Sequence, residues 1–377
     1  MSKIRNIEFL RLIGCIVIIC FHLFKNSRLH GLFADINLYD HLFKMTCNGQ
    51  KAVDLFFILS GVFFVLTFKS SISLWTFLKK KLVRLYPVLI FCMLLYFVFS
   101  FTGLVKFTLY DNILNLLCLN GTGMVLEVKN VGQFWYVSSM LWVLTLLFYL
   151  LKNFDKKYID LFVALSVFTV YTFLIQAKGG KINNHEQTFY YIFNVGMMRA
   201  IGGIGLGYFI GDWYKRNVEN IQNCIISLKS KILLTICEFV CLYFIINNLL
   251  LHKLCFKNHM IFIAAFVGII VLFMFNKGFI SKFFDKDIYV NLSKYTYSIY
   301  MTHIFIYEMF QNLIWKIHPG FVYSYPILNI FLVLSTAICM GIFTYHLVEE
   351  PCTKYFKQKA NLVKIPVNIE FRGGGSF

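Results

Sequence analysis

Long apolar runs recur along the whole 377-residue chain and alternate with short polar stretches rich in lysine. A helix needs about 20 mostly apolar residues to cross the hydrocarbon core of a bilayer. The candidate segments lie at residues 6–25, 52–69, 85–104, 132–151, 158–176, 196–213, 232–251, 258–276, 290–312 and 325–347. Their apolar runs are continuous rather than alternating, which favours helices over a transmembrane barrel. The pattern therefore predicts an all-α integral membrane protein with about ten transmembrane helices.

Composition excludes a soluble multidomain protein. Hydrophobic residues make up 59% of the chain and charged residues 14%, so its apolar surface exceeds what one soluble core could bury. Most of the 11 cysteines lie within apolar segments, where they are typical small buried hydrophobes. There is no CxxC pair and no zinc-like spacing, so we expect no metal site. We expect a transmembrane domain over residues 1–350 and a short polar cytoplasmic tail over residues 351–377, without regular structure.

The distribution of lysine and arginine predicts the orientation of the chain in the membrane. If the N-terminus lies inside, the loops on that side hold about twice as many basic residues as the opposite loops, and positively charged loops tend to stay in the cytoplasm. Both termini are therefore predicted to be cytoplasmic. The formal charge of +18 follows mostly from this asymmetry. Because the basic residues are scattered rather than gathered on one face, nucleic acid is not an expected partner.

Ionisable residues inside the predicted spans are the candidates for function, because they are costly in lipid and usually face a cavity or a partner. Arg11 and His22 in the first span are eleven residues apart, which places them on one helix face about 16 Å apart along the axis. Asp54, at the predicted outer end of the second span, lies at the level of His22 and would orient an imidazole that acts as a general base. The alternatives are that His22 is interfacial, that Asp54 marks the wet end of its helix, and that Arg11 pairs with Glu8.

Further candidates follow the same reasoning. Tyr300 and His303 are neighbours on one face of the ninth span, although a buried histidine is more often a packing element. Arg199, at the outer start of the sixth span, would bind the acceptor or an oxyanion, or would only set topology. The glycines that follow Arg199 favour close helix packing and would also leave a passage for a long ligand arm. A basic cluster precedes the third span and would bind anionic phosphates, or only touch acidic lipids; it consists of Lys79, Lys80, Lys81 and Arg84.

Several of these segments, taken together and in order, resemble the membrane-bound acyltransferase-3 family, which O-acylates surface carbohydrates and related acceptors. The resemblance spans nearly the whole chain. Its motifs are the basic residue, ten-residue gap and histidine of Arg11 and His22, VDLFFILSG at 53–61, the basic stretch to Arg84 and Pro87, the Trp135 region, SKYTYSIYMTH at 293–303, and the closing FTYHLVEEP.

The resemblance implies that an acyl group, usually acetyl, passes from cytoplasmic acyl-CoA to a hydroxyl of an extracytoplasmic carbohydrate or glycolipid. It makes His22 the catalytic histidine, with Arg11 paired to it, in a multi-pass protein of the cytoplasmic membrane. His22 would act as the general base or would carry the acyl group as a covalent intermediate. We add Asp54 as the residue that orients His22, the basic cluster as the donor site, and Arg199, Trp135, Tyr300 and His303 as acceptor-binding candidates.

Two positions depart from the family pattern. The paired arginines of the family fall on Lys81 and Arg84, so one bidentate phosphate contact is lost. Met140 stands where many members have glutamate, which suggests a different acceptor. A transporter that uses Arg11, His22 and His303 as a path is the alternative from another class, although we find no repeated halves. A membrane scaffold with incidental polar residues is a third.

Overall fold

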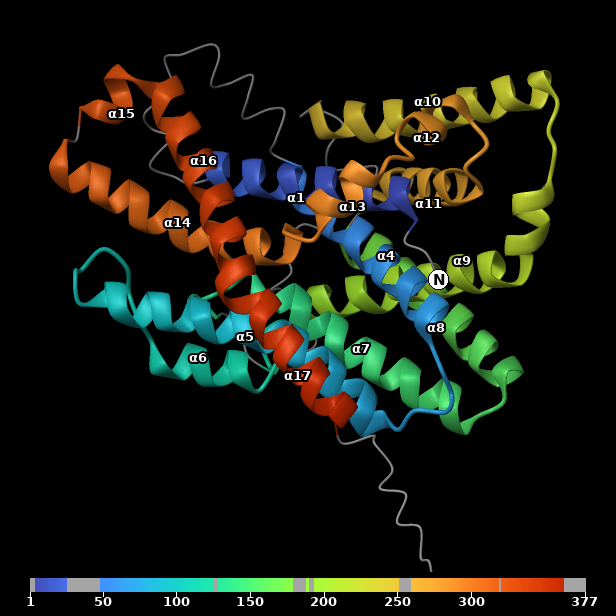
Figure 1. Cartoon of the computed structure of the whole chain (residues 1–377), viewed down its shortest axis with the longest axis horizontal. Coiled ribbons are helices and arrows are strands. Elements are labelled where there is room, and N and C mark those ends of the chain that lie inside the picture. Colours follow the sequence, from blue (N-terminus) through green and yellow to red (C-terminus); the bar gives the residue numbers. More distant parts are fainter. Residues whose placement is uncertain are drawn as a thin grey trace, which may run out of the picture.

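The structure, a computed structural model, describes residues 4–25, 48–124, 128–178, 188–189, 193–250, 259–318 and 320–362. These residues form a bundle of helices (Figure 1). The helical elements are α1 (Arg5–Lys25), η1 (Gly49–Lys51), α4 (Ala52–Thr67), α5 (Leu74–Ser100), α6 (Leu109–Leu116), α7 (Phe134–Asn153), α8 (Lys156–Lys178), α9 (Val195–Asn223), α10 (Leu228–Leu250), α11 (His259–Phe275), α12 (Phe279–Phe283), α13 (Asp287–Ser293), α14 (Thr296–Ile317), α15 (Phe321–Ser324), α16 (Pro326–Thr344), the π-helical turn η2 (Tyr345–Glu349) and α17 (Glu350–Leu362). Within the described part, regular β-structure is confined to β1 (Thr188–Phe189), which pairs antiparallel with β2 (Phe193–Asn194).

Length and composition confirm that the chain is a helical, multi-pass membrane protein. Seven described helices are long and apolar enough to cross a membrane, namely Arg5–Leu23, Gly49–Thr67, Leu74–Ser100, Phe134–Asn153, Lys156–Gln176, Leu228–Asn247 and Ile327–Phe356. The predicted span at 258–276 corresponds to the shorter apolar helix α11. The predicted spans at 196–213 and 290–312 fall on α9 and α14, whose polar residues and glycines lower their hydropathy. The full count of ten stays a prediction.

Two predicted boundaries were wrong for physical reasons. α5 begins eleven residues before the predicted span, because Ser73 caps it by accepting a hydrogen bond from the Thr76 amide at 3.1 Å. The basic cluster therefore lies within a helix rather than ahead of one. At the other end, the helix passes through the π-helical turn at the predicted stop and continues in α17, so part of the predicted unstructured tail is helical. Residues 363–377 lie outside the described residues.

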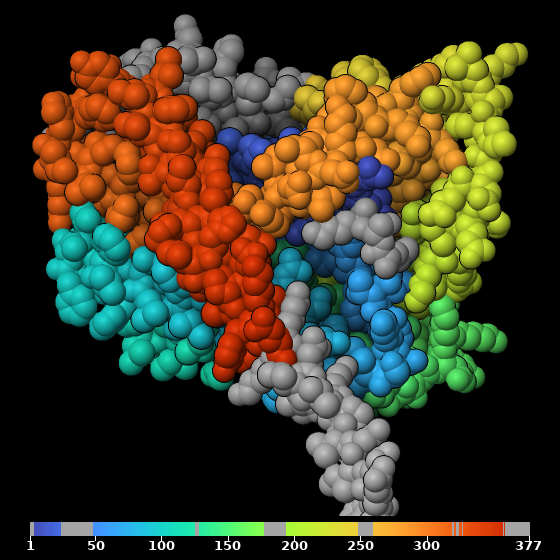
Figure 2. Space-filling model, viewed as in Figure 1, coloured from blue at the N-terminus to red at the C-terminus, as the bar shows by residue number. Residues whose placement is uncertain are grey.

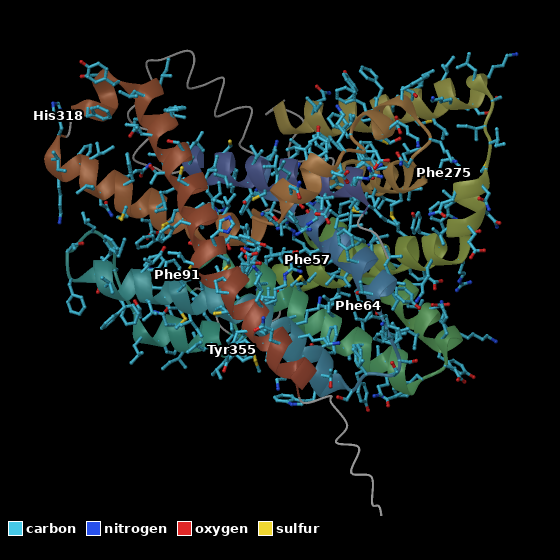
Figure 3. The ribbon with its side chains drawn as sticks, in the orientation of Figure 1. Phe57, Phe64, Phe91, Phe275, His318 and Tyr355 are labelled. Atoms are coloured by element: carbon cyan, nitrogen blue, oxygen red, sulfur yellow. The ribbon has the colours of Figure 1, made fainter. Side chains whose placement is uncertain are left out.

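α4 and α9 form the most closely packed helix pair at the centre of the bundle. A Cβ atom added at Gly207 would overlap the carbonyl oxygen of Ile58, and one at Gly61 would overlap that of Ile204. Small residues allow this close approach of backbones in membranes. Figure 3 shows Phe57 and Phe64 of α4 inside the bundle, and His318 near its edge. The glycine-rich stretch after Arg199 is thus a packing surface, as predicted.

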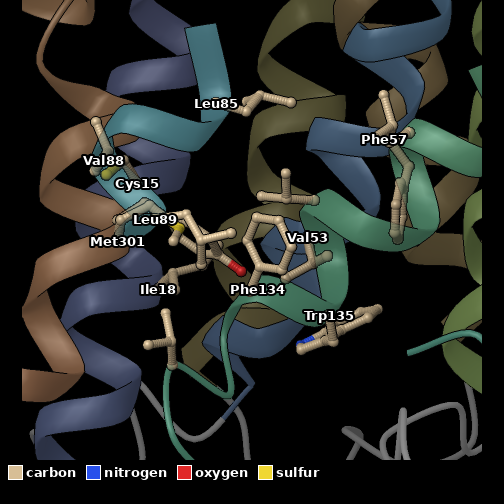
Figure 4. Packing of buried hydrophobic residues seen from close by; sticks show 14 of the residues in the cluster. Cys15, Ile18, Val53, Phe57, Leu85, Val88, Leu89, Phe134, Trp135 and Met301 are labelled. Atoms are coloured by element: carbon tan, nitrogen blue, oxygen red, sulfur yellow. The ribbon is translucent and has the colours of Figure 1, made fainter. Parts of the chain in front are cut away.

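The hairpin of α14 and α16 packs beside α1. The start of α14 is tied to both partner helices. The Ser298 hydroxyl donates to Glu349, beyond the carboxyl end of α16, at 2.6 Å, and Arg11, in the amino-terminal half of α1, approaches the Thr296 hydroxyl at 3.5 Å. Apolar side chains fill the space between α1, α5, α7 and α14 (Figure 4). Cys15 and Cys92 are buried there as predicted, whereas Cys237 and Cys339 lie on exposed helix faces.

Candidate active site

α1 carries Arg11 and His22 toward α14, as its periodicity predicts. The Arg11 guanidinium binds the buried Glu8 carboxylate at 2.6 Å, so the predicted i,i+3 pair is present. His22 is half-buried, and its ring centroid lies 5.2 Å from that of His303. His22 and His303 are 281 positions apart in the sequence, and their imidazoles therefore meet inside the bundle through the packing of α1 and α14.

His303 is fully buried, and one of its ring nitrogens makes a hydrogen bond to the backbone. Its Nδ1 lies 2.6 Å from the Tyr300 carbonyl oxygen, which can only accept, so Nδ1 carries the proton in the neutral ring. Nε2 is then an acceptor, and it has no hydrogen-bond partner. The ring also contacts Tyr307, whose hydroxyl donates to the Ile19 carbonyl at 2.8 Å. Because Nε2 of His303 lacks a donor and lies beside a second histidine, it is arranged to accept a proton or a hydrogen bond from a hydroxyl group.

Gln133, which the sequence did not single out, joins α7 to α14 at this point. Its side-chain amide nitrogen donates to the Met301 carbonyl, and its main-chain carbonyl accepts a hydrogen bond from the Tyr300 hydroxyl at 2.8 Å. Its side-chain oxygen is buried and unpartnered. Leaving such a group unsatisfied costs about 1–3 kcal/mol. Two orphan acceptors, on Gln133 and His303, therefore lie at one turn of α14 and fit a ligand that supplies hydrogen-bond donors.

Asp54 has partners other than the one we predicted. Its carboxylate receives two bonds from Arg199, at 2.9 and 3.0 Å, and one from His259 Nε2 at 3.0 Å. All three side chains are buried. The imidazole that Asp54 orients is therefore that of His259. The described ring contacts of His22 are with Phe21 and His303.

Arg199 and Trp135 are brought together rather than set around a cavity. The Arg199 guanidinium lies 5.6 Å from the centre of the Trp135 ring and donates a further bond to the Gln50 carbonyl at 3.1 Å. Trp135 is buried and also contacts Phe57. The cation–π contact adds to the ion pair, so the described contacts of Arg199 are internal ones.

The four members of the basic cluster differ in their surroundings. Lys79 and Lys80 are exposed, while Lys81 is half-buried with its Nζ 5.6 Å from the Phe77 ring centre. Arg84 is exposed, and the carbonyl of the next residue, Leu85, accepts a hydrogen bond from the Tyr297 hydroxyl at 2.7 Å. Tyr297 follows Thr296, which Arg11 approaches. Arg11 and Arg84 therefore lie near the same end of α14.

Figure 2 shows a hollow on the face in view, bordered by the orange segment that includes α13, the blue α4, and the red α16 and α17. Glu349 lies at the junction of α16 and α17 and is buried. Met140, the departure from the family pattern, accepts a contact from the Ser60 hydroxyl at 3.3 Å, and Ser60 also meets Tyr136 at 3.1 Å. Side chains of α4 and α7 thus form a small polar contact inside the bundle.

Sequence signals for two of the unforeseen residues were present. His259 begins the predicted eighth span, where an ionisable residue at a membrane boundary marks a candidate. Glu349 follows the last predicted span by two positions, within the closing FTYHLVEEP motif. Gln133 carried no such signal. Among the residues that the structure describes, no group of three or more His, Cys, Asp or Glu side chains is arranged to hold a metal ion.

These features define the class: a multi-pass helical membrane protein in which two histidines, from α1 and α14, meet inside the bundle. A family model described as an acyltransferase domain matches residues 4–345. The chain therefore belongs to the acyltransferase-3 family. No curated protein and no solved structure gave a match.

Proposed function

We propose that the protein is a membrane O-acyltransferase that moves an acetyl group from cytoplasmic acetyl-CoA to a hydroxyl of an extracytoplasmic carbohydrate or glycolipid. One observation carries the proposal. Arg11, which approaches the Thr296 hydroxyl at 3.5 Å, and the His22–His303 pair lie along the same two helices, α1 and α14. Arg84 of α5 adjoins Leu85, whose carbonyl accepts a hydrogen bond from Tyr297 at the arginine end of α14. A reaction that begins with an anionic donor at one end and needs a base within the membrane requires this order.

The donor site is assigned to the arginine end. Arg84, together with Lys79, Lys80 and Lys81, would bind the phosphates of the coenzyme, because guanidinium and ammonium groups recognise phosphate by charge and hydrogen bonds. By the distribution of basic residues, this end faces the cytoplasm, with both termini. The extended arm of the donor would then pass the approximately 16 Å of α1 that separates Arg11 from His22.

The chemistry is assigned to His22. The thioester is already activated, so the acceptor hydroxyl needs a base to take its proton. His22 accepts this proton, the hydroxyl oxygen attacks the thioester carbonyl carbon, and the C–S bond breaks. The proton then returns to the departing thiolate to give free coenzyme A. His303 Nε2, which lacks a donor, holds His22 or the acceptor hydroxyl in place by accepting a hydrogen bond.

The remaining polar residues support these steps. The ion pair of Asp54 and Arg199, with His259 and Trp135, fixes α4, α7, α9 and α11 relative to one another. Tyr300 and Gln133 hold the turn of α14 that carries His303. These are positioning residues, because their described contacts are with the protein itself.

The test uses purified protein in lipid vesicles with acetyl-CoA labelled in the acetyl group and a cell-envelope extract as acceptor. Wild type should release coenzyme A and label the extract. We expect His22→Ala to lower the transfer rate by about 10²–10⁴-fold, the usual contribution of a general base. A transporter would leave the acetyl group on its carrier and label nothing. Full transfer by His22→Ala would falsify the base assignment.

A further inference from the structure

Polar side chains form a stripe along the face of α14 that meets α1. Their spacing of four, three, four and four residues keeps them on one side of a helix. Each is at most 8% exposed. The stripe consists of Thr296, Tyr300, His303, Tyr307 and Gln311. Buried polar residues in a membrane helix usually face a cavity or a partner.

The inner part of the stripe is satisfied by α1 and α7. Thr296 lies against Arg11, Tyr300 donates to the Gln133 carbonyl, and Tyr307 donates to the Ile19 carbonyl. The histidine pair lies between these contacts. The stripe therefore follows the proposed path of the reaction from the donor end outward.

Gln311 ends the stripe and differs from the other members. Its side chain is 7% exposed, and neither its amide oxygen nor its amide nitrogen has a hydrogen-bond partner. A buried amide without partners costs about 1–3 kcal/mol for each unsatisfied group. It lies eight residues beyond His303, about 12 Å farther along the helix. A residue that carries this cost beside the reaction path is placed for a ligand.

A second unpartnered amide lies at the same level of the hairpin. Asn329 of α16 is 1% exposed, and both of its side-chain polar atoms lack partners. Gly341 of α16 packs directly against Ile299 of α14, which fixes the register of the two helices. Gln311 and Asn329 are each twelve residues from this contact, so both lie about 18 Å toward the α15 end.

We propose that Gln311, with Asn329 at the same level of the hairpin, binds the hydroxyl-bearing acceptor on the outer side of the histidine pair. Each side-chain amide has one oxygen that accepts hydrogen bonds and two N–H groups that donate them, and it carries no net charge. These groups suit neighbouring hydroxyls of a carbohydrate better than they suit an anion. The amides contact a part of the acceptor remote from the reacting hydroxyl, so they act on specificity rather than on the bonds that change. This inference rests on the proposed function.

The experiment measures transfer as a function of acceptor concentration for wild type and Gln311→Leu in vesicles, with the labelled acetyl-CoA and cell-envelope extract described above. We expect the acceptor concentration for half-maximal transfer to rise about tenfold or more, because a site built to bind hydroxyls loses its partners. The acetyl-CoA concentration for half-maximal turnover should stay within about twofold of wild type. Extraction of the labelled product into water or organic solvent distinguishes a glycan from a glycolipid.

Asn312→Leu is the matched control. The Asn312 amide donates to the Leu104 carbonyl, so its loss should lower the unfolding temperature without changing the acceptor dependence. Gln311→Leu should unfold no earlier than wild type, because leucine removes an unsatisfied buried amide. An unchanged acceptor dependence in Gln311→Leu, with active wild type, would overturn this inference alone. Wild type that labels no acceptor would overturn the proposed function and this inference with it.

Discussion

Two buried polar clusters in this bundle are built in opposite ways. Around Asp54, the carboxylate receives three hydrogen bonds and the glycine-lined backbones of α4 and α9 are in direct contact. Around His303, the acceptor nitrogen has no donor, and the side-chain oxygen of Gln133, which is bound to the same turn of α14, has none either. In the first cluster the charged groups are paired with one another, and the unpartnered atom is Nδ1 of His259. The second retains capacity for a ligand, which is why we place chemistry there and stability at the first.

The largest expected effect on stability is at the first cluster. Asp54→Asn removes the charge that Arg199 and His259 share and leaves a buried guanidinium without its counter-ion. Breaking one partner of a buried pair costs about 3–5 kcal/mol. We therefore expect a large fall in the unfolding temperature, measured in detergent or nanodiscs by loss of helical signal.

The control for this change is the double variant Asp54→Leu/Arg199→Met. Replacing both charges with apolar side chains is often neutral or stabilising, so the double variant should recover much of the lost stability. If Asp54→Asn kept wild-type stability but lost acetyl transfer, Asp54 would belong to the reaction rather than to the scaffold, and the contrast between the clusters would fail.

His303→Leu should show the opposite behaviour. It removes an imidazole whose Nε2 has no partner, so the unfolding temperature should stay near that of wild type. Transfer should fall by about 10²-fold, equivalent to about 2.7 kcal/mol in the barrier, because His22 loses the ring that lies against it. The rate of acetyl transfer in vesicles and the unfolding temperature are measured on the same preparation.

His303→Gln keeps a hydrogen-bond acceptor and serves as the conservative comparison. It should retain more transfer than His303→Leu. Equal loss in both variants would mean that the ring itself is required. A fall in stability with unchanged transfer would show that His303 is only a packing element, the alternative that the sequence left open.

The sequence predicted what depends on local spacing and missed what depends on distant contacts. Periodicity alone placed Arg11 and His22 on one face and made Tyr300 and His303 neighbours. It could not pair Asp54 with His259, because 205 positions separate them. The same limit explains Gln133, whose function depends on a turn of α14 far along the chain.

The predicted helix boundaries were wrong where a helix continues through charged residues. A criterion based on apolar runs stops at lysine, yet lysine and arginine favour helices, and so α5 extends back over the basic cluster. For the same reason α17, which is polar, was expected to lack structure. The glycines after Arg199 were interpreted correctly because backbone contact needs only their small size.

The smallest predicted effects are those of substitutions in the basic cluster, which should differ from one member to the next. They test whether the reaction path begins where we place it. Arg84 adjoins Leu85, whose carbonyl accepts a hydrogen bond from Tyr297 at the start of α14, whereas Lys79 lies farther back on an exposed part of α5. Arg84→Ala should therefore raise the acetyl-CoA concentration for half-maximal turnover by about tenfold, or about 1.4 kcal/mol. Arg84→Lys should give an intermediate value, since an ammonium group keeps the charge but not the bidentate contact. Lys79→Ala should change it by less than about twofold, because exposed charges contribute little. Equal effects of Arg84→Ala and Lys79→Ala would mean that the donor is attracted by overall charge, without a defined phosphate contact at the entrance to the α1–α14 path.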